Sequence, residues 1–464
     1  MAMKIRIEKD SLGELEVPES AYYGVQTARA IANFPISGLR PHPTFIKATA
    51  MVKWAAAETN IMLKKLNPKI GKVIQQAAVE VIEGKLHDQF VVDVFQAGAG
   101  TSHNMNTNEV IANRAIELLG GKRGEYKLVH PNDDVNMSQS TNDIFPTAMR
   151  VAALLMCEEL LTALARLEKE LGQKAKAFDG IIKSGRTHLQ DAVPIRLGQE
   201  FGGYARAIQI LKEKIKTAST GLREIGLGGS AAGTGINTHP QYAKRVVAPL
   251  KKISGLSLVP AKNLFERMQS LGDFVTISGA LRGLSVELIR IANDLRLLSS
   301  GPRTGFNEIV LPPVQPGSSI MPGKVNPVMA EVTNMVSFHV IGNDLAVTMA
   351  AQAGQMELNV MMPIVNFNLL QSFEILTNTI NLFSERCIKG ITANKEDCLK
   401  FAENSVGLAT ILNQSVGYEV AATVAKESVK TGKSLREIVV EKGILSAAEA
   451  KKVFDPIKMT RPSA

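Results

Sequence analysis

The sequence predicts an all-α protein built around a central bundle of five long helices. Between residues 143 and 390, apolar residues recur at steps of three or four in four stretches and in a weaker pattern over residues 332–347, the spacing of helices that bury one side. Hydrophobic residues make up 45% of the chain but aromatic residues only 5%, so aliphatic side chains must fill the core, as in helical bundles. A chain of 464 residues exceeds one ordinary core. We expect three domains, at residues 1–142, 143–390 and 391–464.

Each of the five stretches carries one seam of apolar residues. The third seam covers residues 274–298, roughly 36 Å of helix at a rise of about 1.5 Å per residue. The seams are Cys157, Leu160, Leu164, Leu167 and Leu171; Phe201, Tyr204, Ile208, Leu211 and Ile215; Phe274, Ile277, Leu281, Leu284, Leu288, Ile291, Leu295 and Leu298; Val332, Val336, Val340 and Val347; and Val365, Leu369, Phe373, Leu376, Ile380 and Phe383.

The third of these helices has apolar residues outside its seam, at Val275, Val286, Ile289 and Leu297. Its apolar arc is therefore wider than one neighbouring helix needs. We infer that the bundle also packs against other subunits.

Shorter helical patterns flank the bundle. In the N-terminal domain they cover Phe45–Leu66 and Ile70–Glu83. In the C-terminal domain, the turn Thr431–Ser434 is followed by a predicted helix from Leu435 to Lys442, with Ser434 as its N-cap.

Composition argues against several classes of protein. The net charge is +9, but Lys and Arg are interleaved with acidic residues, so we expect solvated helix faces and no nucleic-acid partner. No run of eighteen apolar residues and no signal peptide is present, which argues against a membrane partner. Three sparse cysteines fit a reducing cytoplasm. The histidines lack metal-ligand spacing, and Gly226–Gly235 lacks the ending of a phosphate loop.

One stretch, residues 317–327, reads Gly-Ser-Ser-Ile-Met-Pro-Gly-Lys-Val-Asn-Pro. Its glycines and prolines interrupt both helix and strand, so it is predicted to be a loop. It offers a hydroxyl to move a proton, and a cation and an amide to hold a carboxylate. On composition alone, a solvated linker is the alternative.

Three further polar stretches supply hydrogen-bond donors, at residues 98–106, 138–143 and 185–191. Each has a structural alternative: a Gly/Thr/Asn turn, a helix cap, and a histidine with no catalytic part. Together with residues 317–327, four separated stretches therefore supply hydrogen-bond donors.

The loop 317–327 resembles the signature Gly-Ser-Ser-x-Met-Pro-x-Lys-x-Asn of the fumarase/aspartase superfamily, and the resemblance extends over essentially the whole chain. It implies elimination of a group from a small dicarboxylate substrate with a succinyl skeleton, releasing fumarate. It also implies a homotetramer with a twenty-helix core and active sites shared between subunits. No cofactor and no metal ion are expected.

The resemblance assigns roles within the signature loop. Ser318 is the base that takes the β-proton, and a hydroxyl can do so only if its alkoxide is stabilised. The expected stabilisers are the backbone N–H groups of Ser319 and Ile320 and the charge of Lys324. Lys324 and Asn326 bind the α-carboxylate. Ser319 helps to hold the β-carboxylate, and Met321 lines the pocket.

By the same resemblance, Thr101, Ser140, Thr141 and Asn142 form a second group of substrate-binding residues. Thr101 supplies a hydroxyl from the first polar stretch. Ser140 and Thr141 hold the reacting carboxylate, and Asn142 touches the leaving group.

The third group comes from the stretch 185–191. Thr187 is expected to bind the distal carboxylate and His188 to lie near the leaving group as a catalytic residue. Glu331 is expected to pair with His188, which would hold the imidazole in one orientation and raise its pKa.

Details of the motifs favour the aspartase branch, in which the leaving group is ammonia. Ser140-Thr141-Asn142 is the aspartase form, whereas class II fumarases read Ser-Ser-Asn. In contrast, His130–Asp134 looks like fumarase, where such residues form a second anion site. Class II fumarase is therefore the alternative enzyme. A recruited structural protein is the alternative from another class, disfavoured because Ser318, Lys324 and Asn326 are all present.

Overall fold

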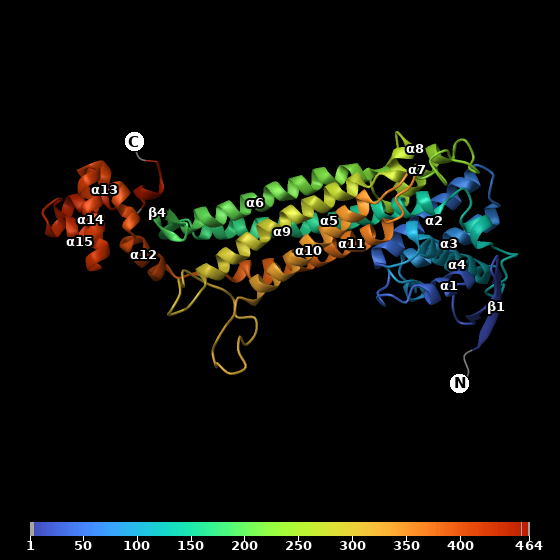
Figure 1. Ribbon diagram of the computed structural model, residues 1–464, viewed down its shortest axis with the longest axis horizontal. Coiled ribbons are helices and arrows are strands. Elements are labelled where there is room, and N and C mark those ends of the chain that lie inside the picture. The colour runs from blue at the N-terminus through green and yellow to red at the C-terminus, as the bar shows by residue number, and fades with distance from the viewer. Residues whose placement is uncertain (1–3, 456, 463–464) are drawn as a thin grey trace. The chain divides into compact units, whose positions relative to one another are not determined.

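The computed structural model describes residues 4–455 and 457–462 (Figure 1). Most of this part of the chain is helical, which confirms the all-α prediction. The helices are α1 (Val25–Asn33), α2 (Pro43–Met62), α3 (Pro68–Ile82), α4 (Thr101–Leu118), α5 (Thr141–Ala177), α6 (Leu197–Ala218), α7 (Tyr242–Ser254), α8 (Leu264–Gln269), α9 (Gly272–Leu298), α10 (Val328–Gln352), α11 (Met362–Arg386), α12 (Lys395–Asn404), α13 (Ala409–Val416), α14 (Tyr418–Thr431), α15 (Leu435–Glu441) and α16 (Ala447–Val453).

Strands occur only in pairs in the described residues. Each pair is a separate two-stranded sheet, and three of the pairs are antiparallel. The pairs are β1 (Ile5–Asp10) with β2 (Gly13–Pro18), β3 (Ile182–Thr187) with β4 (Gln190–Arg196), β5 (Glu224–Ile225) with β6 (Val259–Pro260), and β7 (Ile309–Val310) with β8 (Thr392–Ala393).

The chain forms two compact units. The first holds the residues up to Leu161 with Glu213–Gly283 and Phe338–Thr377; the second holds Thr162–Lys212, Leu284–Ser337 and the residues from Asn378 on. The five long helices α5, α6, α9, α10 and α11 each contribute residues to both units. The three-domain division at residues 142 and 390 stays a prediction.

Four of the predicted seams form the core of the long helices, whereas in the α10 seam Val340 and Val347 are buried but Val332 and Val336 are only half-buried. Every seam residue of α5, α9 and α11 is buried, as are most of those of α6. Outside the α9 seam, Val286 and Leu297 are exposed, whereas Val275 and Ile289 are half-buried. Polar contacts join the long helices within each unit, such as Tyr204 with Asp294 and Asn343 with Ser372. Further contacts of this kind are Lys212–Glu168, Asn334–Asn293 and Ser278–Asp344.

The flanking helices also lie where the sequence predicts them. Helices α2 and α3 correspond to the two N-terminal patterns and enclose a core with α4. In the second unit, Ser434 forms a reciprocal capping box with Glu437 at the start of α15. Helices α13 to α16 bury a separate small core around Leu412, Val424 and Ile438.

Candidate active site

In the first unit, a tight turn delivers Thr101 to the start of α4. Gly100 has φ +86°, and a Cβ atom there would lie 2.1 Å from the ring of Phe145. Only glycine fits this position. Gly100 has no side chain that could cap α4, and Thr101, the first residue of the helix, is exposed. The start of α4 therefore combines the partial positive charge of a helix N-terminus with an exposed hydroxyl, and both favour binding of an anion.

The start of α5 is held by a buried carboxylate. Asp143 Oδ1 accepts from Ser140 N–H at 2.9 Å, and Oδ2 accepts from the N–H groups of Gly228 and Ser230 at 2.9 and 3.0 Å. The glycine-rich loop 226–235 therefore cradles an anion, but that anion is the protein's own carboxylate. This arrangement fixes Ser140 and Thr141 at the helix N-terminus.

A hydrogen bond joins these two helix starts. Asn104, in the first turn of α4, donates from Nδ2 to Thr141 Oγ1 at 2.9 Å. Asn142 donates from Nδ2 to Ala231 O at 2.8 Å. In the part of the chain that the structure describes, nothing donates to Asn142 Oδ1, so this acceptor is available to a ligand that carries N–H groups.

Buried titratable side chains lie close to the N-termini of α4 and α5. Lys53 of α2 donates from Nζ to Asn104 Oδ1 at 2.8 Å. Burial lowers the pKa of Lys53 well below its usual value, although the charge of Asp143 opposes the shift. Burial likewise raises the pKa of Asp143 to about 6, against the effect of the backbone N–H groups that it accepts from. Burial, together with the charge of Lys53, lowers the pKa of His103 to about 3.

In the second unit, Thr187 and His188 lie at the tip of the hairpin β3–β4. His188 and Leu189 form its two-residue turn with φ of +55° and +58°, a left-handed geometry that hairpin turns require. The side chains of Thr187 and His188 are exposed. Non-glycine residues adopt such backbone angles at a cost, and that strain is typical of functional turns.

A buried carboxylate anchors this hairpin. Glu308 is 0% exposed and accepts from Arg186 NH1 at 3.0 and 3.1 Å, and Lys183 Nζ lies 3.0 Å from its Oε2. The Arg186 guanidinium also stacks on Phe306, 4.2 Å from the ring centroid. Arg186 directly precedes Thr187, so these contacts fix the base from which the tip projects. The sequence did not reveal this anchor, because its partners are distant in the chain.

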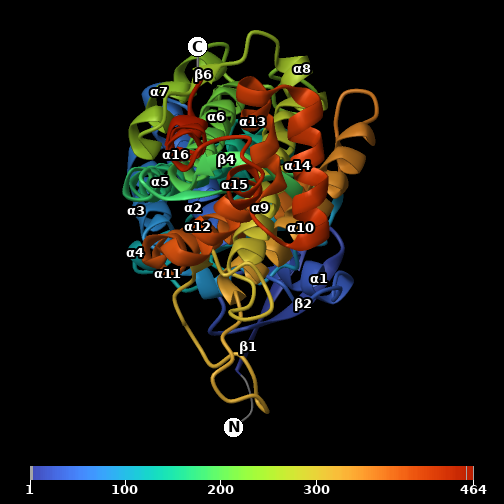
Figure 2. The ribbon, with the colours of Figure 1, turned by 90° about the vertical axis from the view of Figure 1, so that its left-hand side faces the viewer.

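The signature loop leaves β7 and returns to the start of α10, and Figures 1 and 2 show it projecting from the ends of α9 and α10. Its base is closed by Gly317 N–H donating to Lys324 O at 2.8 Å and by Asn326 Nδ2 donating to Gly317 O at 2.6 Å. A Cβ atom at Gly317 would lie 2.5 Å from Lys324 O. One N–H of the Asn326 amide therefore closes the base of the loop, which leaves the other to bind a ligand.

Within the loop, Ser318 Oγ accepts from two backbone N–H groups, those of Ile320 at 3.2 Å and Met321 at 3.0 Å. Ile320 was expected as a donor. Ser319 was expected as the second donor, but Met321 takes that place, because the Ser318 hydroxyl accepts from the N–H groups two and three residues ahead, as in a serine N-cap. Two N–H donors favour the alkoxide form of Ser318.

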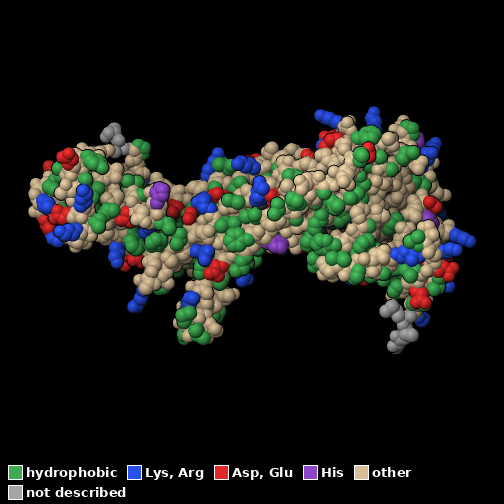
Figure 3. Space-filling view, viewed as in Figure 1, with side chains coloured by type: hydrophobic (Ala, Val, Ile, Leu, Met, Phe, Trp, Pro, Cys, Tyr) green, Lys and Arg blue, Asp and Glu red, His purple; other side chains and the backbone are tan. Residues whose placement is uncertain are grey.

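The loop tip is unusually apolar for an exposed segment. Ile320 is 83% exposed, and Met321 and Val325 are also exposed; Figure 3 shows hydrophobic side chains gathered at this end. Ser319 and Lys324 are exposed beside them. The loop therefore presents its hydroxyl, its cation and its apolar side chains together.

The predicted residues thus form groups within each unit. Thr101, Ser140, Thr141 and Asn142 gather in the first unit; the other eight lie in the second, on the hairpin, the loop and the first turn of α10, which holds Glu331. Among the residues described, no ion pair joins His188 to Glu331, and that pairing stays a prediction. Asn104 lies in the polar stretch 98–106 but was given no role of its own, and Lys53 was not singled out; a lone lysine in the apolar stretch 50–57 was the available signal.

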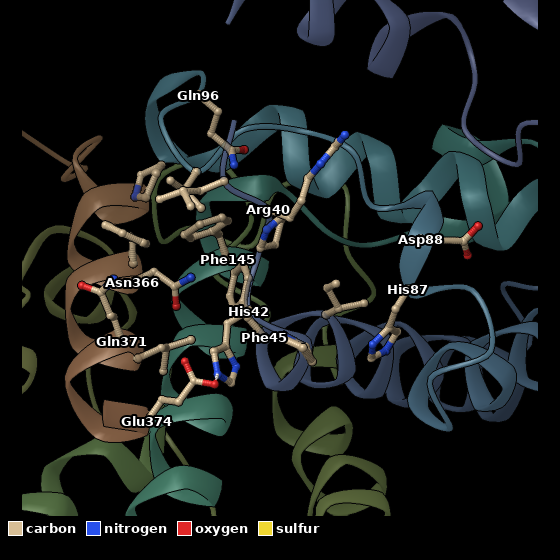
Figure 4. A pocket seen from close by; sticks show the side chains of 18 residues that line it. Arg40, His42, Phe45, His87, Asp88, Gln96, Phe145, Asn366, Gln371 and Glu374 are labelled. Atoms are coloured by element: carbon tan, nitrogen blue, oxygen red, sulfur yellow. Dashed lines mark ion pairs between the residues drawn. The ribbon is translucent and has the colours of Figure 1, made fainter. Parts of the chain in front are cut away.

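A separate cavity of about 520 Å³ lies in the first unit between α2, α11 and the segment 87–96 (Figure 4). His42 Nδ1 accepts from Thr44 N–H at 3.1 Å and so caps α2, and its Nε2 lies 3.6 Å from Glu374 Oε1. Burial lowers the pKa of His42. None of the predicted site residues lines this cavity, and of its two histidines, His42 and His87, the first caps α2.

Comparison with known proteins identifies the family. The profile of the Lyase family matches residues 13–342, and that of the fumarase C C-terminus matches residues 408–461. The chain belongs to the fumarase/aspartase superfamily. Enzymes of this superfamily act on small dicarboxylates, and the chain is a lyase.

Members of the superfamily match along almost their whole length. The aspartate ammonia-lyase of a Bacillus species is 51% identical, covering 100% of this chain and 99% of that one. The aspartate ammonia-lyase of Bacillus subtilis is 50% identical, covering 98% and 96%. Among solved structures, a class II fumarase from Schistosoma mansoni has a TM-score of 0.95 at 36% identity, covering 99% and 100%.

A cobalt-bound structure of fumarate lyase:delta crystallin from Brucella melitensis has a TM-score of 0.96 at 50% identity, covering 99% of this chain and 100% of that one. In the present chain, residues 4–455 and 457–462 contain no cluster of three or more His, Cys, Asp or Glu side chains arranged to hold a metal ion. No described helix is long and apolar enough to cross a membrane.

Proposed function

We propose that the chain is an aspartate ammonia-lyase, which converts L-aspartate to fumarate and ammonia. The observation that carries this proposal is the hydroxyl of Ser318, which accepts two backbone N–H bonds in a loop that also bears Lys324. The half-identical aspartate ammonia-lyases that match over the full length support it.

The reaction begins at Cβ of the substrate. Ser318, as the alkoxide, takes a proton from Cβ, and the electron pair moves into the adjacent carboxylate to give an enediolate. The N–H groups of Ile320 and Met321 and the charge of Lys324 stabilise the alkoxide before the transfer. The enediolate then collapses, a C–C double bond forms, and the C–N bond breaks with its electron pair leaving on nitrogen.

The developing dianion needs donors on the reacting carboxylate. Ser140, Thr141 and Ser319 supply hydroxyls, and Thr187 binds the distal end from the tip of the hairpin. Lys324 and Asn326 hold the α-carboxylate, and Thr101 adds a hydroxyl at the N-terminus of α4. Met321 covers the apolar side of the substrate.

Ammonia is favoured over water by Asn142. Its Nδ2 is occupied by Ala231 O, so it offers an acceptor to the leaving group. The ammonium group of L-aspartate carries only donors, which such an acceptor matches. His188, oriented by Glu331, lies near the same group. Class II fumarase remains the second candidate because of the likeness of His130–Asp134 and the 36% identical fumarase structure.

We also propose a homotetramer whose active sites combine residues of different subunits. Support comes from α10, where Met335, Phe338, Leu345 and Met349 are exposed. Their spacing of three, seven and four places them on one side of the helix, and an exposed apolar stripe of this length is typical of a subunit interface. The three free cysteines are all buried, which fits a location in the reducing cytoplasm.

The absorbance of fumarate tests the leaving group directly. Purified protein is given L-aspartate in one cuvette and L-malate in another, and the ultraviolet absorbance is followed. The proposal predicts a rise with L-aspartate and none with L-malate. A rise with L-malate alone would establish the fumarase alternative, and silence with both would favour a structural role.

A further inference from the structure

Lys53 is a fully buried cation without a carboxylate partner. It lies in the middle of α2 at 0% exposure, and none of the ion pairs between described residues includes it. Its Nζ donates to Asn104 Oδ1 at 2.8 Å and to Asn136 Oδ1 at 2.9 Å. Burying an ammonium group is costly, so a neutral residue would serve better if packing alone were needed at this position.

The ammonium group fixes the orientation of the Asn104 amide. Lys53 Nζ faces two amide oxygens, Asn104 Oδ1 and Asn136 Oδ1, and donates to both, so the oxygen of the Asn104 amide is turned toward the lysine. Nδ2 therefore faces Thr141 and donates to its Oγ1 at 2.9 Å. Without Lys53, only the hydrogen bonds from Nδ2 to Thr141 and, at 3.3 Å, to Asn136 Oδ1 hold this orientation, so the amide turns over more easily and can present its oxygen to Thr141.

The amide orientation in turn decides what the Thr141 hydroxyl does. Because Thr141 Oγ1 accepts from Asn104, its own proton points elsewhere, and it is donated to no other residue in the described chain. If the amide turned over, Asn104 Oδ1 would take that proton. The orientation seen here leaves the hydroxyl as a donor for a ligand.

Lys53 also holds a second amide, that of Asn136. Asn136 Oδ1 accepts from Lys53 at 2.9 Å, from Asn108 Nδ2 at 3.2 Å and from Asn104 Nδ2 at 3.3 Å. Its own Nδ2 donates to Gln139 O at 3.1 Å. Lys53 thus also fixes the segment that leads into Ser140.

We propose that Lys53 is a positioning residue for the substrate, which acts through Asn104 to keep the Thr141 hydroxyl oriented as a donor to a substrate carboxylate. This inference rests on the proposed function for the identity of the ligand. Lys53 itself takes no part in proton transfer, and the chain of contacts runs from Lys53 to Asn104, to Thr141 and to the carboxylate.

A double-mutant cycle tests the inference. Lys53→Met, Thr141→Val and the double variant are compared by the dissociation constant of succinate, a dicarboxylate that has no leaving group, and by kcat and KM for L-aspartate. Lys53→Met alone is expected to weaken succinate binding about tenfold, the loss of one hydrogen bond to a charged group. In the Thr141→Val background the same change is expected to have less than a twofold effect (about 0.4 kcal/mol). Equal effects in both backgrounds would overturn the proposal.

Asn104→Asp is a second, nearly isosteric variant that keeps the contact with Lys53. A carboxylate at this position accepts the Thr141 proton, so binding of succinate is expected to weaken without loss of stability. Repulsion between the new carboxylate and succinate would persist in an Asn104→Asp, Thr141→Val double variant, whereas the diverted hydrogen bond would not. A full effect in that background would count against the orientation of Thr141.

Arg150→Met is the matched control. Arg150 is also a buried cation of the first unit, but it donates to Asp273 and Gly221 O. Its loss should lower stability and leave succinate binding unchanged. The wild-type assay separates the two proposals: an enzyme that releases fumarate from L-malate instead would refute the aspartase assignment, yet the succinate cycle would still decide the role of Lys53.

Discussion

The side-chain amide of Asn104 donates a 2.9 Å hydrogen bond to the hydroxyl oxygen of Thr141. This bond joins the N-termini of α4 and α5, and with them the hydroxyls of Thr101 and Ser140 in the first unit. Two helix N-termini held together in this way attract an anion more strongly than either alone. A dicarboxylate is a suitable ligand for this group.

The first prediction concerns the base. Ser318→Ala should lower kcat for L-aspartate by about 10²- to 10⁴-fold, the usual contribution of a positioned proton acceptor. Binding of succinate should change little, because the variant keeps Lys324 and Asn326. Steady-state kinetics and calorimetry measure the two effects, and an undiminished kcat would remove Ser318 from the reaction.

The second prediction concerns the base of the loop. Gly317→Ala brings a Cβ atom within 2.5 Å of Lys324 O, so the hydrogen bond between these residues must break. We expect kcat/KM to fall at least about tenfold, because Ser318 and Lys324 lose their fixed spacing. Gly172→Ala is the control, since a Cβ atom there meets nothing within 4 Å. Equal activity of both variants would show that the loop does not need this closure.

The long helices were predictable because their signal is local. The α9 seam from Phe274 to Leu298 is read directly from spacing, and the structure buries all of it. The hairpin β3–β4 was not recognised as paired strands, because residues 185–191 were read as a polar turn. Its fixed base depends on Glu308, more than a hundred residues away from Arg186.

The candidate site was predicted from its motifs, but the contacts that support those motifs were not. Thr141 and Ser318 stand in recognisable patterns, whereas Lys53 stands in an ordinary helical one. The positioning role proposed for Lys53 depends on its contacts with Asn104 and Asn136, which only folding brings together. Contacts at such sequence distances leave no periodic trace in a single sequence.

The third prediction concerns the leaving group. In the reverse reaction, Asn142→Leu should raise KM for ammonium about tenfold, the loss of one acceptor for a charged donor. KM for fumarate should change much less, because its carboxylates bind to other residues. Initial rates with each substrate varied in turn measure both constants. Equal changes in the two constants would show that Asn142 does not contact the ammonium.

The fourth prediction concerns stability. Burial lowers the pKa of His103 to about 3, whereas an unfolded histidine titrates near about 6.5. Between these values the unfolded chain binds the extra proton, so lowering the pH favours unfolding. From pH 7 to pH 5, His103 should therefore cost about 2 kcal/mol of stability.

That cost should be absent in His103→Leu, which preserves the apolar contact with Phe45. Urea unfolding of both proteins at one protein concentration, at pH 7 and pH 5, gives the difference. Parallel losses in the two proteins would mean that His103 titrates normally when folded.

The most direct test of the central claim mixes two defective proteins. One carries Ser318→Ala, and the other carries Thr141→Val with Asn142→Leu. If an active site takes Thr141 and Ser318 from different subunits, co-assembly in equal amounts should leave about a quarter of the sites intact and restore about a quarter of the wild-type rate of fumarate release. Activity that stays at the level of the separate variants would contradict the account, because it would mean that each site is built within one chain.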